Sequence, residues 1–263
     1  MERFERRTET PKVFHAEPLF IDLIRDLGAR KGEAEWNFGF GLTDNQLYDE
    51  YQMLVEYEWA PRDHLGLEIE LPVTLHTTFD RSASVPPNQL ESLKLATQWT
   101  VRVDTAQHVS LAVGYLHEFL LPSSLNEFTR RPLAGHLFNP FGVAAKRWGT
   151  SWHTLLYAGP RITRLAGAEW EPLEIQANWN VHYMLPNTRN FIGVELNQSI
   201  ARRASDVVIR PQMRLGINDS MLMGLAVGVP INRERERLGV FMRLIYEPGH
   251  GAGHRTGAAT VQR

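Results

Sequence analysis

Apolar and polar residues alternate along most of the chain, from residue 35 to about residue 247. A period of two puts successive side chains on opposite faces and is typical of β-strands. Between residues 50 and 59, for example, Tyr51, Met53 and Val55 share one face, whereas Glu56 and Glu58 share the other. The pattern predicts twelve strands, at residues 35–43, 48–59, 65–77, 91–103, 109–120, 138–147, 152–163, 172–184, 190–200, 206–217, 221–230 and 238–247.

The connections between these segments differ in length on the two sides of the predicted sheet. Far-side loops fall at residues 43–47, 78–90, 121–137, 164–171, 201–205 and 231–237, and near-side turns fall at 60–64, 104–108, 148–151, 185–189 and 218–220. Long loops on one side and short turns on the other are typical of outer-membrane barrels. An open edge in hydrocarbon would leave backbone groups unpaired, so the last strand should pair with the first. The sequence therefore predicts an all-β, twelve-stranded, antiparallel, up-and-down outer-membrane β-barrel over residues 35–247.

The two faces of the predicted strands differ in character, and the fold depends on which one points inward. The polar face is rich in glycine, alanine and serine, and small residues fit a crowded lumen. We therefore place the polar face inside and the apolar face against lipid. A soluble periplasmic barrel that binds an apolar ligand is the alternative.

This assignment predicts two sets of residues. The predicted lumen charges are Glu50, Glu56, Glu58, Glu68, Glu70, Lys94, Arg102, Lys146, Arg161, Arg210, Arg214 and Arg243. The predicted aromatic belt at the near-side lipid interface is Trp36, Tyr57, Trp59, Trp99, Trp179, Tyr183 and Tyr246.

A short amphipathic stretch, HAEPLFIDLIRDLG, precedes the strands at residues 15–28. Pro18 suits a first helical turn, and Gly28 suits the residue after a helix. The apolar positions that recur at helical spacing are Leu19, Phe20, Leu23, Ile24 and Leu27. The pattern predicts a helix within residues 15–30, roughly 16 Å long and too short to cross a bilayer. We expect it to cap the near-side mouth or plug the lumen, with residues 1–14 flexible and residues 248–263 disordered.

Composition narrows the possible functions. The net charge of −2 makes a nucleic-acid partner improbable, and the absence of cysteine excludes disulfides and thiol chemistry. No apolar run approaches the ~20 residues of a membrane helix. The opening MERFERRTETPK has no apolar core, so the sequence as given shows no secretion signal. We expect no cofactor and no metal site.

The string HAEPLFIDLIRDLGARKGEAEWN resembles the opening of a bacterial family known by a near-identical HAEPLYID string. The resemblance covers about residues 13–42, and Phe20 stands where the family string has tyrosine. It implies an envelope β-barrel without an established activity, so there are no catalytic residues to transfer.

Several functions remain open for such a barrel. Acidic residues on neighbouring strands opposite lumen arginines would form a transverse field typical of a pore constriction, or they would simply pair and rigidify the interior. An outer-membrane lipid hydrolase is a third possibility, with His76, His117 and the loop serines Ser82, Ser84, Ser123 and Ser124 as candidates, but no nucleophile motif accompanies them. Outer-membrane lipid is the expected partner. Lipopolysaccharide phosphates could bind the far-side arginines Arg81, Arg130, Arg131, Arg164, Arg202, Arg203, Arg233, Arg235 and Arg237.

Overall fold

The structure is a computed structural model that describes residues 10–21, 23–78, 85–123, 125–202, 204–232 and 236–248. The predicted disordered tail, apart from residue 248, and residues 1–9 of the predicted flexible segment lie outside these ranges. Among the described residues, no helix has the length and apolar character needed to span a membrane.

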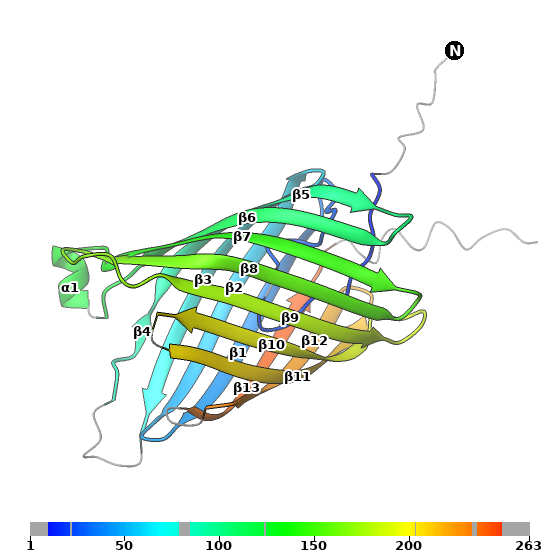
Figure 1. Cartoon of the computed structure of the whole chain (residues 1–263). Coiled ribbons are helices and arrows are strands. Elements are labelled where there is room, and N and C mark those ends of the chain that lie inside the picture. The colour runs from blue at the N-terminus through cyan, green and yellow to red at the C-terminus, as the bar shows by residue number, and fades with distance from the viewer. Residues whose placement is uncertain are drawn as a thin grey trace, which may run out of the picture.

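Twelve long antiparallel strands form a closed barrel (Figure 1). They are β1 (Ala34–Asn45), β2 (Asp49–Arg62), β3 (Leu65–Thr77), β5 (Ser92–Asp104), β6 (Val109–Leu120), β7 (Gly135–Trp148), β8 (Trp152–Leu165), β9 (Glu174–Met184), β10 (Phe191–Ala201), β11 (Ala204–Asn218), β12 (Met221–Pro230) and β13 (Glu236–Tyr246). The two-residue β4 (Gln89–Leu90) pairs with β3 in a far-side loop. Closure joins β1 to β13, with Trp36 opposite Tyr246. The predicted barrel is confirmed, including pairing of its first and last strands.

Alternation along the strands separates an apolar outer face from a largely polar inner face. Outward side chains such as Val55 and Val113 are 43% and 52% exposed. Inward side chains such as Asn37, Glu56 and Glu195 are at most 1% exposed. Large apolar groups in contact with the surroundings and carboxylates in the interior are the reverse of a water-soluble sheet. The outer face is therefore suited to acyl chains.

The predicted N-terminal helix was wrong. Residues 15–28 form no helix where they are described, and the helix found among the described residues, α1 (Leu125–Arg130), lies in a far-side loop. The apolar spacing of residues 15–28 has a different cause, because Leu19 packs in one buried cluster while Leu23 and Leu27 pack in another. Gly28 does adopt a positive φ of 84°, but it does so in a turn where the Ala29 N–H donates to the Asp26 carbonyl.

Candidate functional site: the barrel lumen

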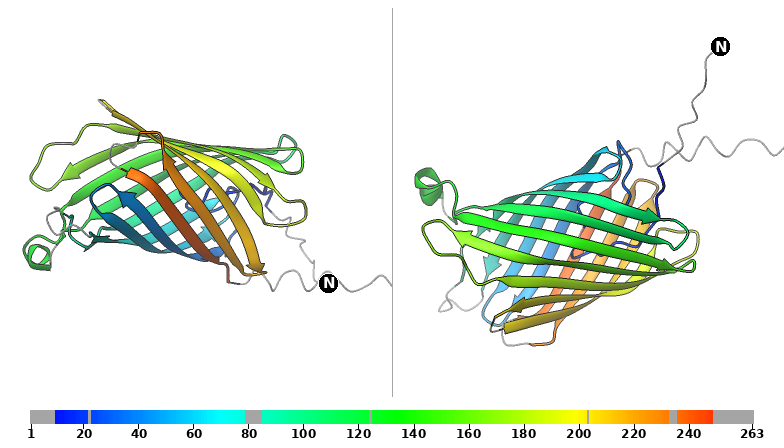
Figure 2. Two further views of the ribbon diagram at one scale, coloured as in Figure 1. Left: turned by 90° about the horizontal axis from the view of Figure 1, so that it is seen from below. Right: turned by 45° about the horizontal axis from the view of Figure 1, so that its top comes forward.

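Residues 10–21 and 23–33, called the lumen segment below, run inside the barrel at its near-side end (Figure 2). Every long strand supplies at least one residue in contact with this segment. In strand order these residues are Glu35, Glu58, Gly66, Gln98, Ser110, Phe141, His153, Met184, Glu195, Gln212, Gly224 and Phe241. The segment is therefore held around the whole circumference of the lumen.

Wall side chains satisfy the backbone of the lumen segment in place of helical hydrogen bonds. The N–H groups of Phe20 and Ile21 donate to the two carboxylate oxygens of Glu195, at 3.2 and 3.0 Å. The Leu19 N–H donates to Gln212 Oε1 at 3.0 Å. Three similar contacts are Ala16 N–H to His153 Nδ1, Gly28 N–H to Thr100 Oγ1, and Gln98 Nε2 to the Arg25 carbonyl. Because buried backbone groups need partners, these wall residues allow a non-helical segment to be buried.

Apolar side chains of the lumen segment bury against an apolar part of the inner wall. Leu23, Ile24 and Leu27 are 2 to 4% exposed. They form one cluster with wall residues of β5 to β8, namely Ala96, Ala112, Phe141, Val143, Ala145, Leu155 and Tyr157. In a second cluster, Leu19 packs with Met184 of β9 and Phe191 of β10. Burying a leucine stabilises by about 1.5–3 kcal/mol, so these contacts hold the segment strongly.

Two glycines of the inner wall make room for the lumen segment. A Cβ at Gly66 would lie 2.5 Å from the Cβ of Arg25, and a Cβ at Gly224 would overlap the side chain of Leu19. The predicted inner face is rich in small residues, and at these two positions the reason is the close approach of the segment. The sequence signal was correct, but its cause was visible only in the structure.

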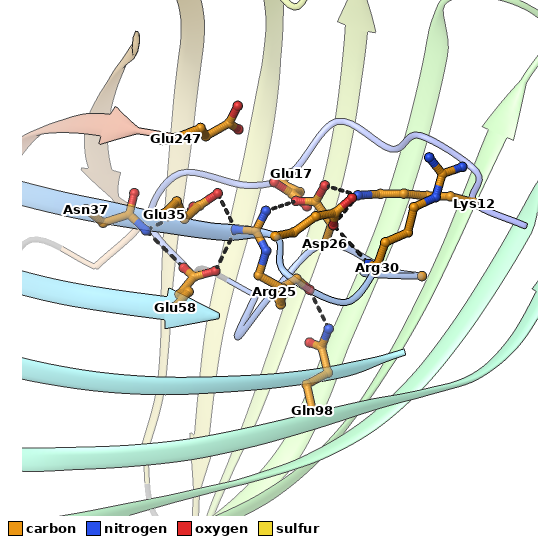
Figure 3. Close-up of polar contacts among 12 residues, drawn as sticks. Lys12, Glu17, Arg25, Asp26, Arg30, Glu35, Asn37, Glu58, Gln98 and Glu247 are labelled. Atoms are coloured by element: carbon orange, nitrogen blue, oxygen red, sulfur yellow. Dashed lines mark hydrogen bonds and ion pairs between the residues drawn. The ribbon is translucent and has the colours of Figure 1, made fainter. Parts of the chain in front are cut away.

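Ion pairs connect the lumen segment to the wall and to itself (Figure 3). The Arg25 guanidinium is 4% exposed and pairs with Glu35 and, at 3.3 Å, with Glu58. Lys12 Nζ lies 2.7 Å from Asp26 and 2.8 Å from Glu33. Glu17 lies 3.7 Å from Arg214 of β11. Charges removed from water in this way need partners, and the segment and the wall supply them to each other.

The protonation states of the segment follow from these surroundings. Burial tends to raise the pKa of Asp26, but Lys12 and Arg25 outweigh it and hold that pKa well below its usual range. Burial and the adjacent Asp26 raise the pKa of Glu17, which favours a proton shared between the two carboxyl groups. Burial, with further contributions from His153 and Arg147, lowers the pKa of His15 to about 3. His15 is therefore neutral when the segment is in place.

A cavity lies between the lumen segment and the far-side loops. Its volume is about 400 Å³, and Phe20, Ile21 and Ile24 of the segment line it on one side. Its charged lining consists of Glu56, Glu68, Glu70, Glu91, Glu118, Lys94, Arg161 and Arg243. A second cavity of about 320 Å³, lined by Glu50 and Arg210, shares Phe20 and Gln52 with the first. We call the two together the vestibule.

The structure places ten of the twelve predicted lumen charges on the inner face. Glu56, Glu58, Glu68, Glu70, Arg210, Arg214 and Arg243 are buried, and Glu50, Lys94 and Arg161 are partly buried. Several are paired, with Lys94 Nζ 2.7 Å from Glu70 and Arg243 3.6 Å from Glu56. The acidic β2 and β3 lie on the other side of β1 from Arg243, as the closed register requires.

Arg102 and Lys146 do not face the lumen, so these two predictions were wrong. A bulge between Thr100 and Arg102 reverses the alternation, and the Arg102 side chain is 62% exposed beside Asp104. On β7 the inward positions next to Lys146 include Phe141, Val143 and Ala145, which pack with the lumen segment. Lys146 therefore points outward, where its Nζ lies 4.2 Å from the ring centroid of Trp148.

All seven predicted belt aromatics lie on the outer face near the near-side turns. The rings of Trp36 and Tyr57 are tilted by 39° with centroids 4.6 Å apart, and Tyr57 stacks on Trp59 at 5.4 Å. The other members are Trp99, Trp179, Tyr183 and Tyr246. Two exposed members of the same group were not predicted, Trp148 and Trp152, which are both 52% exposed.

The two histidines considered for hydrolysis are on opposite faces of the wall. His76 faces inward and lies 3.5 Å from Glu50. His117 faces outward, 3.0 Å from His136 and stacked on Phe119. Ser82, Ser84 and Ser124 lie outside the described residues. The two histidines therefore cannot serve one catalytic centre together.

The profile of the family described as HAEPLYID-like matches residues 11–247 of the chain. No curated protein matches it in sequence. Among solved structures, the fold is similar to the COG4313 outer membrane channel from Pseudomonas putida F1, with a TM-score of 0.66, 12% identity, and coverage of 86% of this chain and 99% of that chain. It is also similar to the KdgM porin (TM-score 0.55, 12% identity, 81% and 98% covered) and the NanC porin (TM-score 0.55, 8% identity, 80% and 97% covered). At these identities the likeness shows a shared fold.

Proposed function

The chain belongs to the HAEPLYID-like family, and we propose that it is a narrow channel of the bacterial outer membrane, closed by its own N-terminal segment. The observation that carries the proposal is the contact of the lumen segment with all twelve long strands, beneath the vestibule, whose larger cavity of about 400 Å³ faces the far-side loops. The outer face supports the membrane location, because its exposed side chains are large and apolar. The fold it shares with outer-membrane channels supports the same reading.

The motif that gives the family its string is the part that enters the lumen. His15 Nε2 lies 2.9 Å from Ser110 Oγ, and the Phe20 ring lies 3.5 Å from the Arg210 guanidinium carbon. Such contacts use side chains of the motif, whereas Glu195 and Gln212 hold its backbone. Both the side chains and the backbone of the motif are thus bound to the barrel wall. We propose that permeation requires the motif to leave this position.

The charges that line the vestibule determine which ions we expect to permeate the channel. Carboxylates outnumber basic groups on the lining of the larger cavity, five to three among the described residues. Because fields are strong inside a narrow, low-dielectric lumen, we expect selectivity for cations over anions. Changing Glu56, Glu58, Glu68 and Glu70 together to glutamine should reduce the cation preference measured from reversal potentials. If it lowers only the thermal stability, these charges are structural.

The direct test is deletion of residues 15–28, followed by conductance measurements in planar bilayers. We expect the full chain to be nearly silent and the deletion variant to form stable open channels. A heat-modifiable band on gels would show that the deleted barrel has folded. Unchanged conductance in a folded deletion variant would refute the closing role and leave a structural envelope component.

A second proposal concerns lipopolysaccharide, for which the far-side arginines are the candidate contacts. Arg81, Arg203, Arg233 and Arg235 lie outside the described residues. Among the others, Arg164 lies 5.1 Å from the ring of Trp170, a pairing that would present a cation and an aromatic ring to a lipid headgroup. Arg164→Ala and Arg202→Ala should weaken binding of purified lipopolysaccharide. Equal binding by the variants would remove this partner.

A further inference from the structure

Three carboxylates meet at the bottom of the vestibule, on β2 and β3. Glu56, Glu58 and Glu68 each place one carboxylate oxygen within 4.8 Å of the other two. Glu56 and Glu58 are 1% exposed and Glu68 is 4% exposed. Glu58 and Glu68 are directly opposite in the register of the two strands. We propose that this triad is a binding site for a divalent cation, with calcium as the best fit.

Glu68 carries the first argument. This residue is more than nine-tenths buried and lines the vestibule, yet its carboxylate makes no hydrogen bond or ion pair with any described residue. A buried carboxylate without a partner is costly. Its neighbours in the triad are also acidic, so its charge would be balanced by a cation from outside the chain or by a proton.

The surrounding charges leave an excess of two. Four carboxylates gather here, those of the triad and Glu35, and they face two guanidinium groups. Arg25 pairs with Glu35 and Glu58, and Arg243 lies 3.6 Å from Glu56. Lys94 forms an ion pair with Glu70. A divalent cation would balance the remaining charge without any rearrangement of these pairs.

Asn37 supplies a second, independent indication. Its side chain is completely buried, its Nδ2 lies 2.8 Å from Glu56 and 2.9 Å from Glu58, and its Oδ1 has no partner. The Nδ2 group has two hydrogens, and it also lies 3.0 Å from a carboxylate oxygen of Glu35. Three carboxylate oxygens therefore compete for two hydrogens. A half-turn of the amide would direct Oδ1 toward the same oxygens. Without a cation, the turned Oδ1 would be repelled by the carboxylate oxygens. With a cation bound between them, Oδ1 would be a further ligand.

The kind of ligands favours calcium over magnesium. The three oxygens lie within 4.8 Å of one another, so an ion between them is at most about 2.8 Å from each, which admits the roughly 2.3–2.6 Å of calcium. Magnesium demands octahedral geometry and gives up its water ligands reluctantly, so a site of several buried carboxylates suits it less. The vestibule provides an entry path and space for water ligands.

The test uses the full chain refolded in detergent and stripped with a chelator. We expect calcium alone to bind with one-to-one stoichiometry by titration calorimetry and to raise the melting temperature, and magnesium to bind more weakly. Glu68→Gln should weaken calcium binding at least about tenfold, because it removes one of three charged ligands. Glu118→Gln is the matched control, since Glu118 lines the same cavity outside the triad.

Two results would overturn the site. One is the absence of calcium-dependent heat and of a melting shift in the unmodified chain at about 10 mM calcium, above the weakest class of extracellular sites. This result would mean that protons balance the buried charge. The other is equal calcium binding by the unmodified chain and Glu68→Gln, which would place the ion elsewhere. The measurement on the unmodified chain decides the question even if a variant fails to fold.

Discussion

The strength of the closed state can be tested at Leu23, which is 2% exposed inside the lumen cluster. Leu23→Ala leaves a cavity against Phe141 and its neighbours, and such changes in well-packed cores cost about 2.7–5 kcal/mol. The substitution destabilises only the state in which the segment is seated in the lumen. In the released segment, the side chain at position 23 is in water in both the unmodified chain and the variant. At about 1.4 kcal/mol per tenfold, the population with the segment released should rise at least roughly a hundredfold.

Limited trypsin digestion measures this population. Arg25 is 4% exposed and ion-paired when the segment is seated, so cleavage after it requires release. When release is fast relative to cleavage, the cleavage rate follows the equilibrium population of the open form. The matched control is Leu71→Ala, which makes the same chemical change at an outward side chain that is 42% exposed. If Leu23→Ala is cleaved no faster than Leu71→Ala, the packing of the segment does not hold the channel closed.

The remaining predictions concern the pH dependence of channel opening and the close packing of Leu19 against Gly224. Released His15 binds a proton below its ordinary pKa of 6.5, whereas seated His15, with its pKa lowered to about 3, does not. Seating should therefore weaken as pH falls from 6.5 toward 3, by up to about 1.4 kcal/mol per pH unit. Channel openings should increase in this window, and His15→Gln should flatten the response; an unchanged pH profile in that variant would contradict the assignment. Gly224→Val should expel Leu19 and raise conductance, whereas Gly142→Val, where a Cβ would meet only the Ala112 carbonyl at 4.0 Å, should not. Equal conductance of the two valine variants would argue against a close fit.

The barrel was predictable from sequence because lipid imposes one rule on every strand. Alternation from Tyr51 to Trp59 or from Leu65 to Leu75 needs no knowledge of other strands, and loop asymmetry then orients the sheet. The assignment of polar residues to the inner face fails where the inner wall packs against apolar side chains. On β7, Phe141 and Val143 face a leucine-rich segment, so the parity inferred for Lys146 was reversed.

The lumen segment was misread because its contacts are far away in sequence. Ile21 lies 174 residues from Glu195, and Leu19 lies 193 residues from Gln212. Apolar residues three and four apart predict a helix only when they pack on one surface, and here Leu19 and Leu23 pack in separate clusters. The bulge that turns Arg102 outward leaves no mark in the local pattern either. The triad at Glu56, Glu58 and Glu68 could be predicted as an acidic patch, but its convergence on one point depends on strand register.

The most direct test of a self-closed channel is a covalent lock. The chain has no cysteine, so Leu19→Cys combined with Gly224→Cys introduces one defined pair. Leu19 Cγ lies 3.1 Å from the position of a Cβ at 224, which puts the two Cβ atoms no more than about 4.6 Å apart, near the range of roughly 3.5–4.5 Å for a disulfide. In planar bilayers at acidic pH, we expect the oxidised protein to stay closed and reduction to restore the openings of the unmodified chain. Equal conductance before and after reduction, with the disulfide verified by mass spectrometry, would contradict closure by the N-terminal segment.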